Sequence, residues 1–205
     1  MELSRPLSTV TPTLDGDVLA ALARTDLTFT LGQLHRILPR HSEEGIRKVL
    51  RRLVRQGVVC SDRVGKTFTY RLNRDHIAAD YVIGLANLQG KLLQRVEDRL
   101  TSWRQSPVYA AMFGSAARGS MTVDSDIDLL LVLPDDVDET SWDTDVENLI
   151  SDVTRWTGND TRALQFRAAE IAAHGLDEPV LRAVQKEGLT VAGTHSWLNG
   201  QLSGK

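Results

Sequence analysis

The sequence has a single cysteine, few aromatic residues and no long apolar run. Cys60 has no second cysteine to pair with, so an internal disulfide is excluded, and its β-prone surroundings indicate a buried structural thiol. No stretch approaches the ~18 apolar residues that cross a bilayer. The first residues lack a basic segment followed by an apolar one, which argues against a secretory signal. We therefore expect a cytoplasmic protein with no membrane partner.

Neither basic nor acidic residues are in large excess, but the two kinds are unevenly distributed along the chain. The 24 Lys and Arg residues stand against 27 Asp and Glu, a net charge of −3. Residues 1–75 carry 13 basic against 8 acidic residues, a net of +5, whereas residues 76–205 carry 11 against 19, a net of −8. Two parts of opposite sign predict two modules with different partners, nucleic acid for the basic part and metal ions for the acidic part.

Residues 14–74 predict three helices followed by a β-hairpin. Apolar residues recur at helical spacing within 15–24, 31–38 and 43–56, and Ser42 is a good N-cap residue for the third helix. The run VVCSDRVGKTFTYRLN then gives two β-rich segments around a basic turn. A third helix with an apolar stripe and a basic opposite side, followed by a basic hairpin, is suited to nucleic acid.

This order resembles the winged helix-turn-helix family of DNA-binding regulators. The resemblance implies that the third helix enters the major groove of double-stranded DNA and that the hairpin contacts the flanking backbone. The implied DNA-binding residues are Ser42, Arg47, Lys48, Arg51, Arg52, Arg55, Arg63 and Lys66. Their cations would mainly bind phosphates, which gives affinity and salt dependence.

Residues 75–104 predict a long linker helix, interrupted by Gly84 and Gly90. Winged-helix proteins usually bind DNA as dimers, so this helix is a candidate dimerisation element and we expect a homodimer. A helix that packs only on its own chain is an equally good interpretation.

The acidic part contains GSAARGSMTVDSDIDLLLV at residues 114–132. A strand over 108–113 is expected before it, and a strand over 126–133 at its end. A phosphate-binding P-loop is excluded because Ser120 stands where that motif needs lysine. A calcium-binding EF-hand is excluded because Leu129 stands where it needs glycine.

Strand geometry suggests that Asp126 and Asp128 bind the same metal ions. Side chains alternate along a strand, so Asp126 and Asp128 project on one face while the aliphatic residues between them are buried. Two such carboxylates can hold two Mg²⁺ ions ~3.5–4 Å apart, a spacing used in phosphoryl transfer. Gly114 allows phosphate to approach the backbone, and Ser115 can bind it.

The pattern GSxxRG followed by SDIDL resembles the signature of minimal nucleotidyltransferases of the DNA polymerase β-like superfamily. The resemblance implies a domain over 105–195 with a mixed sheet flanked by helices, so the whole chain is expected to be α/β (α+β). It implies that two Mg²⁺ are cofactors and that an NTP is the substrate. The implied metal-binding and catalytic residues are Asp126 and Asp128, and the implied nucleotide-binding residues are Gly114, Ser115, Arg118 and Ser125.

One departure concerns the third carboxylate that active members of this superfamily supply from a neighbouring strand. The next strand candidate, 161–166, has Gln165 as its mid-strand polar residue. Asp160 at the strand entrance is the acid that could replace it as a metal ligand, since Glu170 falls beyond the strand. Another helix is expected after Pro179, then a short strand, and the residues after Gly193 indicate a polar, frayed end.

Two functions remain open at this point. The first is transfer of a nucleoside monophosphate from an NTP to an acceptor hydroxyl on an unidentified partner, such as a protein or RNA, coupled to DNA binding. The second is a transcription regulator whose nucleotidyltransferase domain senses nucleotide or a partner protein without efficient catalysis. A toxin–antitoxin module is compatible with either function.

Overall fold

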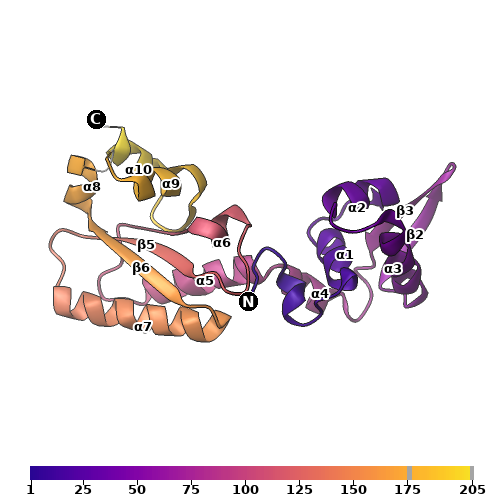
Figure 1. Cartoon of the computed structure of the whole chain (residues 1–205). Helices are drawn as coiled ribbons and strands as arrows, with labels where there is room; N and C mark the ends of the chain where they lie inside the picture. The colour runs from indigo at the N-terminus through magenta and orange to yellow at the C-terminus, as the bar shows by residue number, and fades with distance from the viewer. Residues whose placement is uncertain (175–176, 204–205) are drawn as a thin grey trace. The chain divides into compact units, whose positions relative to one another are not determined.

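A computed structural model describes residues 1–174 and 177–203 and divides the chain into two compact units. The N-terminal unit comprises Glu2 and Ser4–Leu88, and the C-terminal unit comprises Met1, Leu3 and Gln89–Lys205. Figure 1 labels their helices and strands. Among the described residues, no helix combines the length and the apolar content that a bilayer crossing requires.

The N-terminal unit has the winged helix-turn-helix order that the sequence predicts. Its elements are η1 (Pro6–Thr9), α1 (Leu14–Ala23), β1 (Phe29–Thr30), α2 (Leu31–Ile37), α3 (Glu43–Arg55), β2 (Val59–Val64), β3 (Thr67–Leu72) and α4 (Ala79–Ala86). The strands form an antiparallel sheet in the order β1-β3-β2. Its core is built from α1, α2 and α3 with the base of the hairpin, through residues that include Val18, Leu22, Leu34, Ile46 and Leu50.

The caps that begin α2 and α3 fix the ends of these helices. The Ser42 hydroxyl accepts a hydrogen bond from the Gly45 amide at 3.1 Å. Thr30 forms a capping box with Gln33 at the start of α2. Ser42 therefore has a structural role as an N-cap in this fold, which is separate from the DNA contact expected of it.

The stretch 75–104 contains two helices, α4 and α5 (Leu88–Thr101), in place of one linker helix. Asn87 ends α4 with a backbone outside the helical region, at φ −102° and ψ 26°. Helix α4 belongs to the N-terminal unit, whereas α5 belongs to the C-terminal unit and packs Leu92, Val96 and Leu100 into its core. Each half thus stabilises a different unit.

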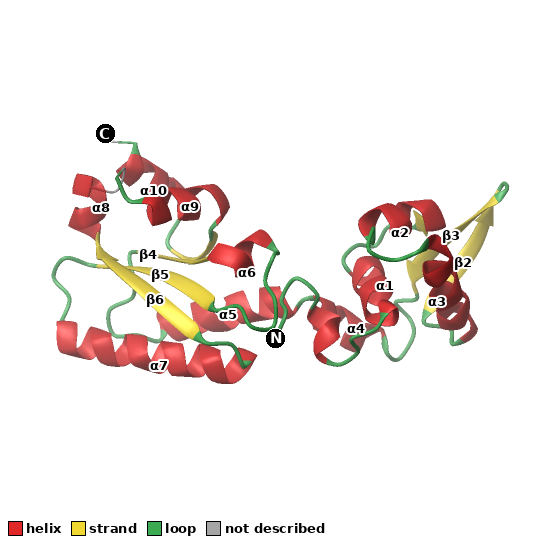
Figure 2. Cartoon of the chain, viewed as in Figure 1, coloured by secondary structure: helices red, strands yellow, loops and turns green. Residues whose placement is uncertain are grey.

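The C-terminal unit is a mixed four-stranded sheet with helices on both faces (Figure 2). Its strands, in the order β6-β5-β4-β7, are β6 (Thr161–Arg167), β5 (Ile127–Leu133), β4 (Tyr109–Phe113) and β7 (Leu189–Ala192). Strand β5 is parallel to β6 and antiparallel to β4. The remaining helices are α6 (Gly114–Arg118), α7 (Glu139–Thr157), α8 (Ala168–His174), α9 (Pro179–Glu187) and α10 (His195–Leu202).

The aliphatic run of β5 is explained by burial on both faces of the sheet. Leu129 and Leu131 pack toward α5 and α7, and Leu130 toward α8, α9 and α10. The expectation of a frayed end is wrong for the residues up to 203, because Leu198 and Leu202 of α10 are buried in that second core.

A buried acid ties α1 to the segments around it within the N-terminal unit. Asp17 is 9% exposed, and its carboxylate accepts hydrogen bonds from Arg5 at 2.8 and 3.1 Å and lies 2.8 Å from His41 Nε2. Burial would raise the pKa of this carboxyl, but the hydrogen bonds from Arg5 and His41 outweigh burial and hold the pKa below its ordinary value of 3.8. The stabilisation is complete above pH 3.8 and is lost as pH falls through the lower, folded-state pKa.

Asp17→Asn should therefore destabilise the N-terminal unit by about 1–3 kcal/mol near neutral pH. The difference from wild type should shrink below about pH 3, because the wild-type carboxyl then also becomes neutral. Hydrogen–deuterium exchange of the α1 amides, compared between the two proteins at each pH, measures this difference. A gap that stays constant down to about pH 2 would show that the charge of Asp17 does not carry the stabilisation.

Candidate active site and basic groove

The Gly-Ser turn and the acidic strand form one site in the C-terminal unit. Antiparallel pairing of β4 with β5 sets Phe113 opposite Asp128, so the next residue, Gly114, lies against the Asp128 side chain. Gly114 has φ +71°, a conformation that favours glycine, and a Cβ there would overlap Asp128 Oδ2. The structure thus brings together the two halves of the sequence motif, and glycine is required where they meet.

Asp126 and Asp128 lie close enough for their charges to interact. Burial, and after it the charge of Asp126, raises the pKa of Asp128, while Arg162 and Arg118 act in the opposite direction. The Asp128 carboxylate forms no hydrogen bond or ion pair with the described parts of the chain. It is therefore available to a ligand.

Arg162 is the residue that the sequence interpretation missed. Parallel pairing sets it in register with Asp128, so both side chains project from the same face of the sheet. Its Nη2 atom lies 2.9 Å from Asp126 Oδ2, and its side chain is 74% exposed. A cation thus stands on the neighbouring strand where the resemblance implies a carboxylate.

Gln165 does not stand where a third carboxylate would meet Asp126 and Asp128, so the sequence interpretation of this residue is wrong. It pairs with Leu131 and so lies on the opposite face of the sheet from Asp128. Its Oε1 accepts a hydrogen bond from Trp142 Nε1 of α7 at 2.6 Å. The error arose because the register of two parallel strands, which decides the face, is not encoded locally in either strand.

Asp160 also does not complete a three-acid site. It is exposed, and its backbone carbonyl accepts a hydrogen bond from the Ile127 amide at 2.8 Å. Within residues 1–174 and 177–203, no three His, Cys, Asp or Glu side chains lie together as a metal-binding group. Glu170 accepts a hydrogen bond from the Arg167 amide at 2.7 Å, at the far end of β6.

The other two residues of the motif with side-chain contacts, Arg118 and Ser125, bind segments next to the site. Arg118 donates to Glu187 of α9 at 2.6 Å. The Ser125 hydroxyl accepts from the Thr122 amide at 3.0 Å and so closes the turn before Asp126. Both side chains have protein partners in this structure.

Asn159 positions the loop that leads to the acids. It is 3% exposed, and its Nδ2 atom donates to the carbonyls of Val123 at 3.0 Å and Ser125 at 2.9 Å. Buried polar side chains of this kind hold loops because their hydrogen bonds are costly to lose. Its position between Gly158 and the start of β6 at Thr161 gives little signal in the sequence, because asparagine there also indicates an ordinary turn.

The two acids fit a magnesium ion, although no third acid among the described residues assists them. Mg²⁺ is typically held by one or two carboxylates together with substrate phosphates. Asp126, directly before β5, and Asp128, within it, supply hard oxygen ligands of that kind, and their charges interact.

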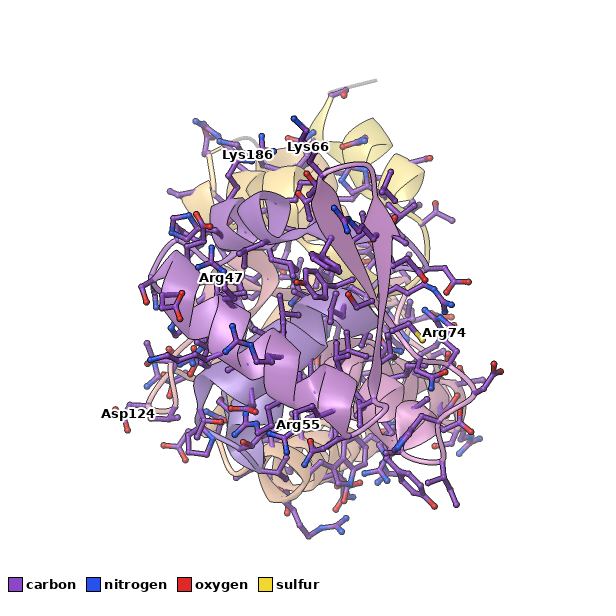
Figure 3. The ribbon with its side chains drawn as sticks, turned by 90° about the vertical axis from the view of Figure 1, so that its right-hand side faces the viewer. Arg47, Arg55, Lys66, Arg74, Asp124 and Lys186 are labelled. Atoms are coloured by element: carbon purple, nitrogen blue, oxygen red, sulfur yellow. The ribbon has the colours of Figure 1, made fainter. Side chains whose placement is uncertain are left out.

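In the N-terminal unit, a groove of about 840 Å³ lies between α3 and the hairpin. Among its lining residues are Arg47, Arg51, Arg55, Lys66, Phe68 and Tyr70. Figure 3 shows Arg47 and Arg55 toward opposite ends of α3 and Lys66 at the hairpin tip. The groove is therefore bordered by cations from both elements.

The other predicted DNA-binding residues differ in their availability. Arg47 is paired with Glu43 at 2.9 Å and Glu44 at 2.7 Å, and Arg52 is paired with Asp15 of α1. The Arg63 Nε atom donates to the Gly65 carbonyl at 3.2 Å, and Lys48 is exposed. By contrast, Arg51, Arg55 and Lys66 have no acidic partner in the described residues.

One family model matches part of the C-terminal unit. Residues 91–176 match the family model of the nucleotidyltransferase domain, so the C-terminal unit contains such a domain. No curated protein matches the chain significantly.

Several solved structures resemble parts of the chain. A toxin–antitoxin structure with AMP-PNP is 16% identical, with a TM-score of 0.40 over 54% of this chain and 81% of that one. A tri-AMPylated HEPN toxin in complex with MNT antitoxin, from Shewanella oneidensis, is 17% identical, with a TM-score of 0.37 over 56% and 84%. TrmBL2, an archaeal chromatin protein, is 15% identical, with a TM-score of 0.30 over 91% and 77%. At these scores the likenesses carry no functional conclusion.

Comparing Gly114→Ala with a control variant should distinguish a loss of folding stability from a displacement of the Asp128 carboxylate. Alanine at φ +71° should cost about 1–2 kcal/mol and should also push the Asp128 carboxylate aside. Gly119→Ala is the matched control, because Gly119 has φ +70° and a methyl group added there would have nothing within 4 Å. Both variants should lose similar stability in urea unfolding, but only Gly114→Ala should bind Mn²⁺ at least about tenfold more weakly. Equal Mn²⁺ affinities in the two variants would contradict a ligand role for Asp128.

Proposed function

We propose that the C-terminal unit transfers a nucleoside monophosphate from an NTP to an acceptor hydroxyl and releases pyrophosphate. The observation that carries this proposal is the contact of Gly114 with Asp128, which joins the phosphate-binding turn to the acids. Gly114 and Ser115 would seat the triphosphate, and Asp126 and Asp128 would hold magnesium. When bound, the cation neutralises charge on the phosphates.

The chain's own contribution to this reaction is mainly positioning. Asn159 and Ser125 hold the loop before the acids, and the buried β5 strand keeps the direction of Asp128 fixed. The acceptor oxygen forms a bond to the α-phosphorus as the bond from that phosphorus to pyrophosphate breaks, and the hydroxyl proton passes to solvent. The acceptor is a hydroxyl group of a protein or RNA partner.

A nucleotide-sensing regulator is the second candidate function. It is favoured by one observation, the ion pair of Arg162 with Asp126 on the face that would carry a third carboxylate. Without that acid, no described side chain beside Asp126 and Asp128 is suited to take the acceptor proton. Such a domain would bind an NTP and turn it over slowly or not at all.

The N-terminal unit binds double-stranded DNA in this proposal. The groove between α3 and the hairpin supports it, because cations from both elements border one concave surface. Arg51 and Arg55, which line the groove, contact phosphates, and Lys66 contacts the backbone from the hairpin tip. The proposed DNA-linked activity thus uses one unit for DNA and the other for nucleotide.

Asp128→Asn should lower transfer by more than about 100-fold, because it removes a metal ligand without changing side-chain size. The measurement is label transfer from α-³²P-labelled NTPs with Mg²⁺, to the protein itself and to protein and RNA fractions. Asp124→Asn is the control, since Asp124 is exposed in the same loop and should retain wild-type activity. NTP binding without transfer in wild type would favour the sensor, and equal transfer by both variants would contradict the assigned site.

The double change Arg51→Ala with Arg55→Ala should weaken binding to duplex DNA. The slope of log affinity against log salt should also fall by about 2, because two phosphate contacts are lost. Fluorescence anisotropy with a labelled duplex at several salt concentrations measures both effects. Arg52→Ala is the control, because Arg52 is already paired with Asp15. A double variant that binds like wild type would remove the groove from the DNA interface.

A further inference from the structure

We propose that Arg162 replaces one of the two divalent cations expected at this site, so that the C-terminal unit binds an NTP with a single metal ion. This inference rests on the proposed binding of an NTP at Asp126 and Asp128. It goes further by assigning Arg162 as a direct ligand of the triphosphate and by fixing the number of metal ions.

The position of Arg162 is the first support. It is in register with Asp128 on the adjacent parallel strand, and its Nη2 atom lies 2.9 Å from Asp126 Oδ2. The guanidinium therefore occupies Asp126 Oδ2, one of the two carboxylate oxygens that a second cation could use. A metal ion that binds this oxygen has to displace the guanidinium.

The charge balance is the second support. Together, Asp126, Asp128 and Arg162 carry one net negative charge, and one divalent cation reverses it to one net positive charge. Three carboxylates with two divalent cations reach the same total. A second divalent cation beside Arg162 would leave three net positive charges in a small space, which like-charge repulsion opposes.

The freedom of the guanidinium is the third support. The Arg162 side chain is 74% exposed, and its ion pair uses one nitrogen. A guanidinium has five N–H donors in a planar fork that matches phosphate oxygens. Arg118, the other arginine near the acids, is held by Glu187 at 2.6 Å. Arg162 is thus the better-placed cation for phosphate.

The test is metal stoichiometry and nucleotide affinity in the full chain. The probes are Mn²⁺, counted by electron paramagnetic resonance, and an α,β-methylene ATP analogue that cannot be cleaved between the first two phosphates. Wild type saturated with the analogue should bind one Mn²⁺ per chain. Arg162→Asp, which supplies a third carboxylate, should bind two.

Affinity without divalent metal gives a second, independent readout. Arg162→Ala should bind the analogue about tenfold more weakly than wild type in EDTA, because a charged phosphate contact is lost. Arg155→Ala is the matched control, since Arg155 is an exposed arginine of the same unit, paired with Asp152 at 2.6 Å, and should bind like wild type. Exposed ion pairs contribute about 0–1 kcal/mol, so both variants should fold normally.

The outcomes separate this inference from the proposed function. Two Mn²⁺ in wild type, one in Arg162→Asp, or unchanged affinity in Arg162→Ala would each overturn the role of Arg162 while leaving nucleotide binding intact. Failure of wild type to bind the analogue with or without Mn²⁺ would overturn both proposals. One bound Mn²⁺ with no nucleotidyl transfer would support Arg162 and reject only the transfer activity.

Discussion

The contact between Gly114 and Asp128 is the constraint on which the candidate site depends. It follows from antiparallel pairing of β4 with β5, which brings the end of one strand beside the start of the other. Because β5 is buried on both faces, the chain cannot easily shift this register without exposing leucines. The fold thus fixes where Asp128 meets the turn that we propose binds phosphate, and only glycine leaves room for the Asp128 carboxylate at position 114. The nucleotidyltransferase match of residues 91–176 covers this same pairing.

Local signals in the sequence predicted most of the fold. Caps, apolar periodicity and turn residues act within a few positions, so α3, β5 and the hairpin were expected close to their observed bounds. The two-residue strand β1 was missed because a periodic pattern cannot appear over two residues. Helix α10 was misread because its stability comes from burying Leu198 and Leu202 against distant elements. Residues 75–104 were expected to form one linker helix interrupted at Gly84 and Gly90, but both glycines are helical and the break falls between them at Asn87.

The candidate site could be predicted only where its parts are neighbours in the sequence. Gly114, Asp126 and Asp128 belong to one continuous motif, and alternation along a strand predicts that both acids share one face, although β5 begins only at Ile127. The position expected to carry a third carboxylate lies on β6. Which residue occupies it depends on the register between the parallel strands β5 and β6. That alignment points Arg162 toward the acids and Gln165 toward Trp142. Such a register is set by packing of the whole unit, so the sequence interpretation chose a residue on the wrong face.

Pairing decides which arginines can act as ligands in both units. On α3, the arginines at 47 and 52 are partly neutralised by neighbouring acids, which leaves Arg51 and Arg55 as the cations better able to bind phosphates. In the C-terminal unit Arg118 is held by Glu187, whereas Arg162 is paired with an acid of the site itself. An arginine paired with an acid that is proposed to bind metal changes the charge that a metal ion and a nucleotide would meet there. A count of Lys and Arg residues therefore overestimates the positive charge that is available to bind an anion. Whether each basic side chain can bind an anion depends on the acid with which it is paired.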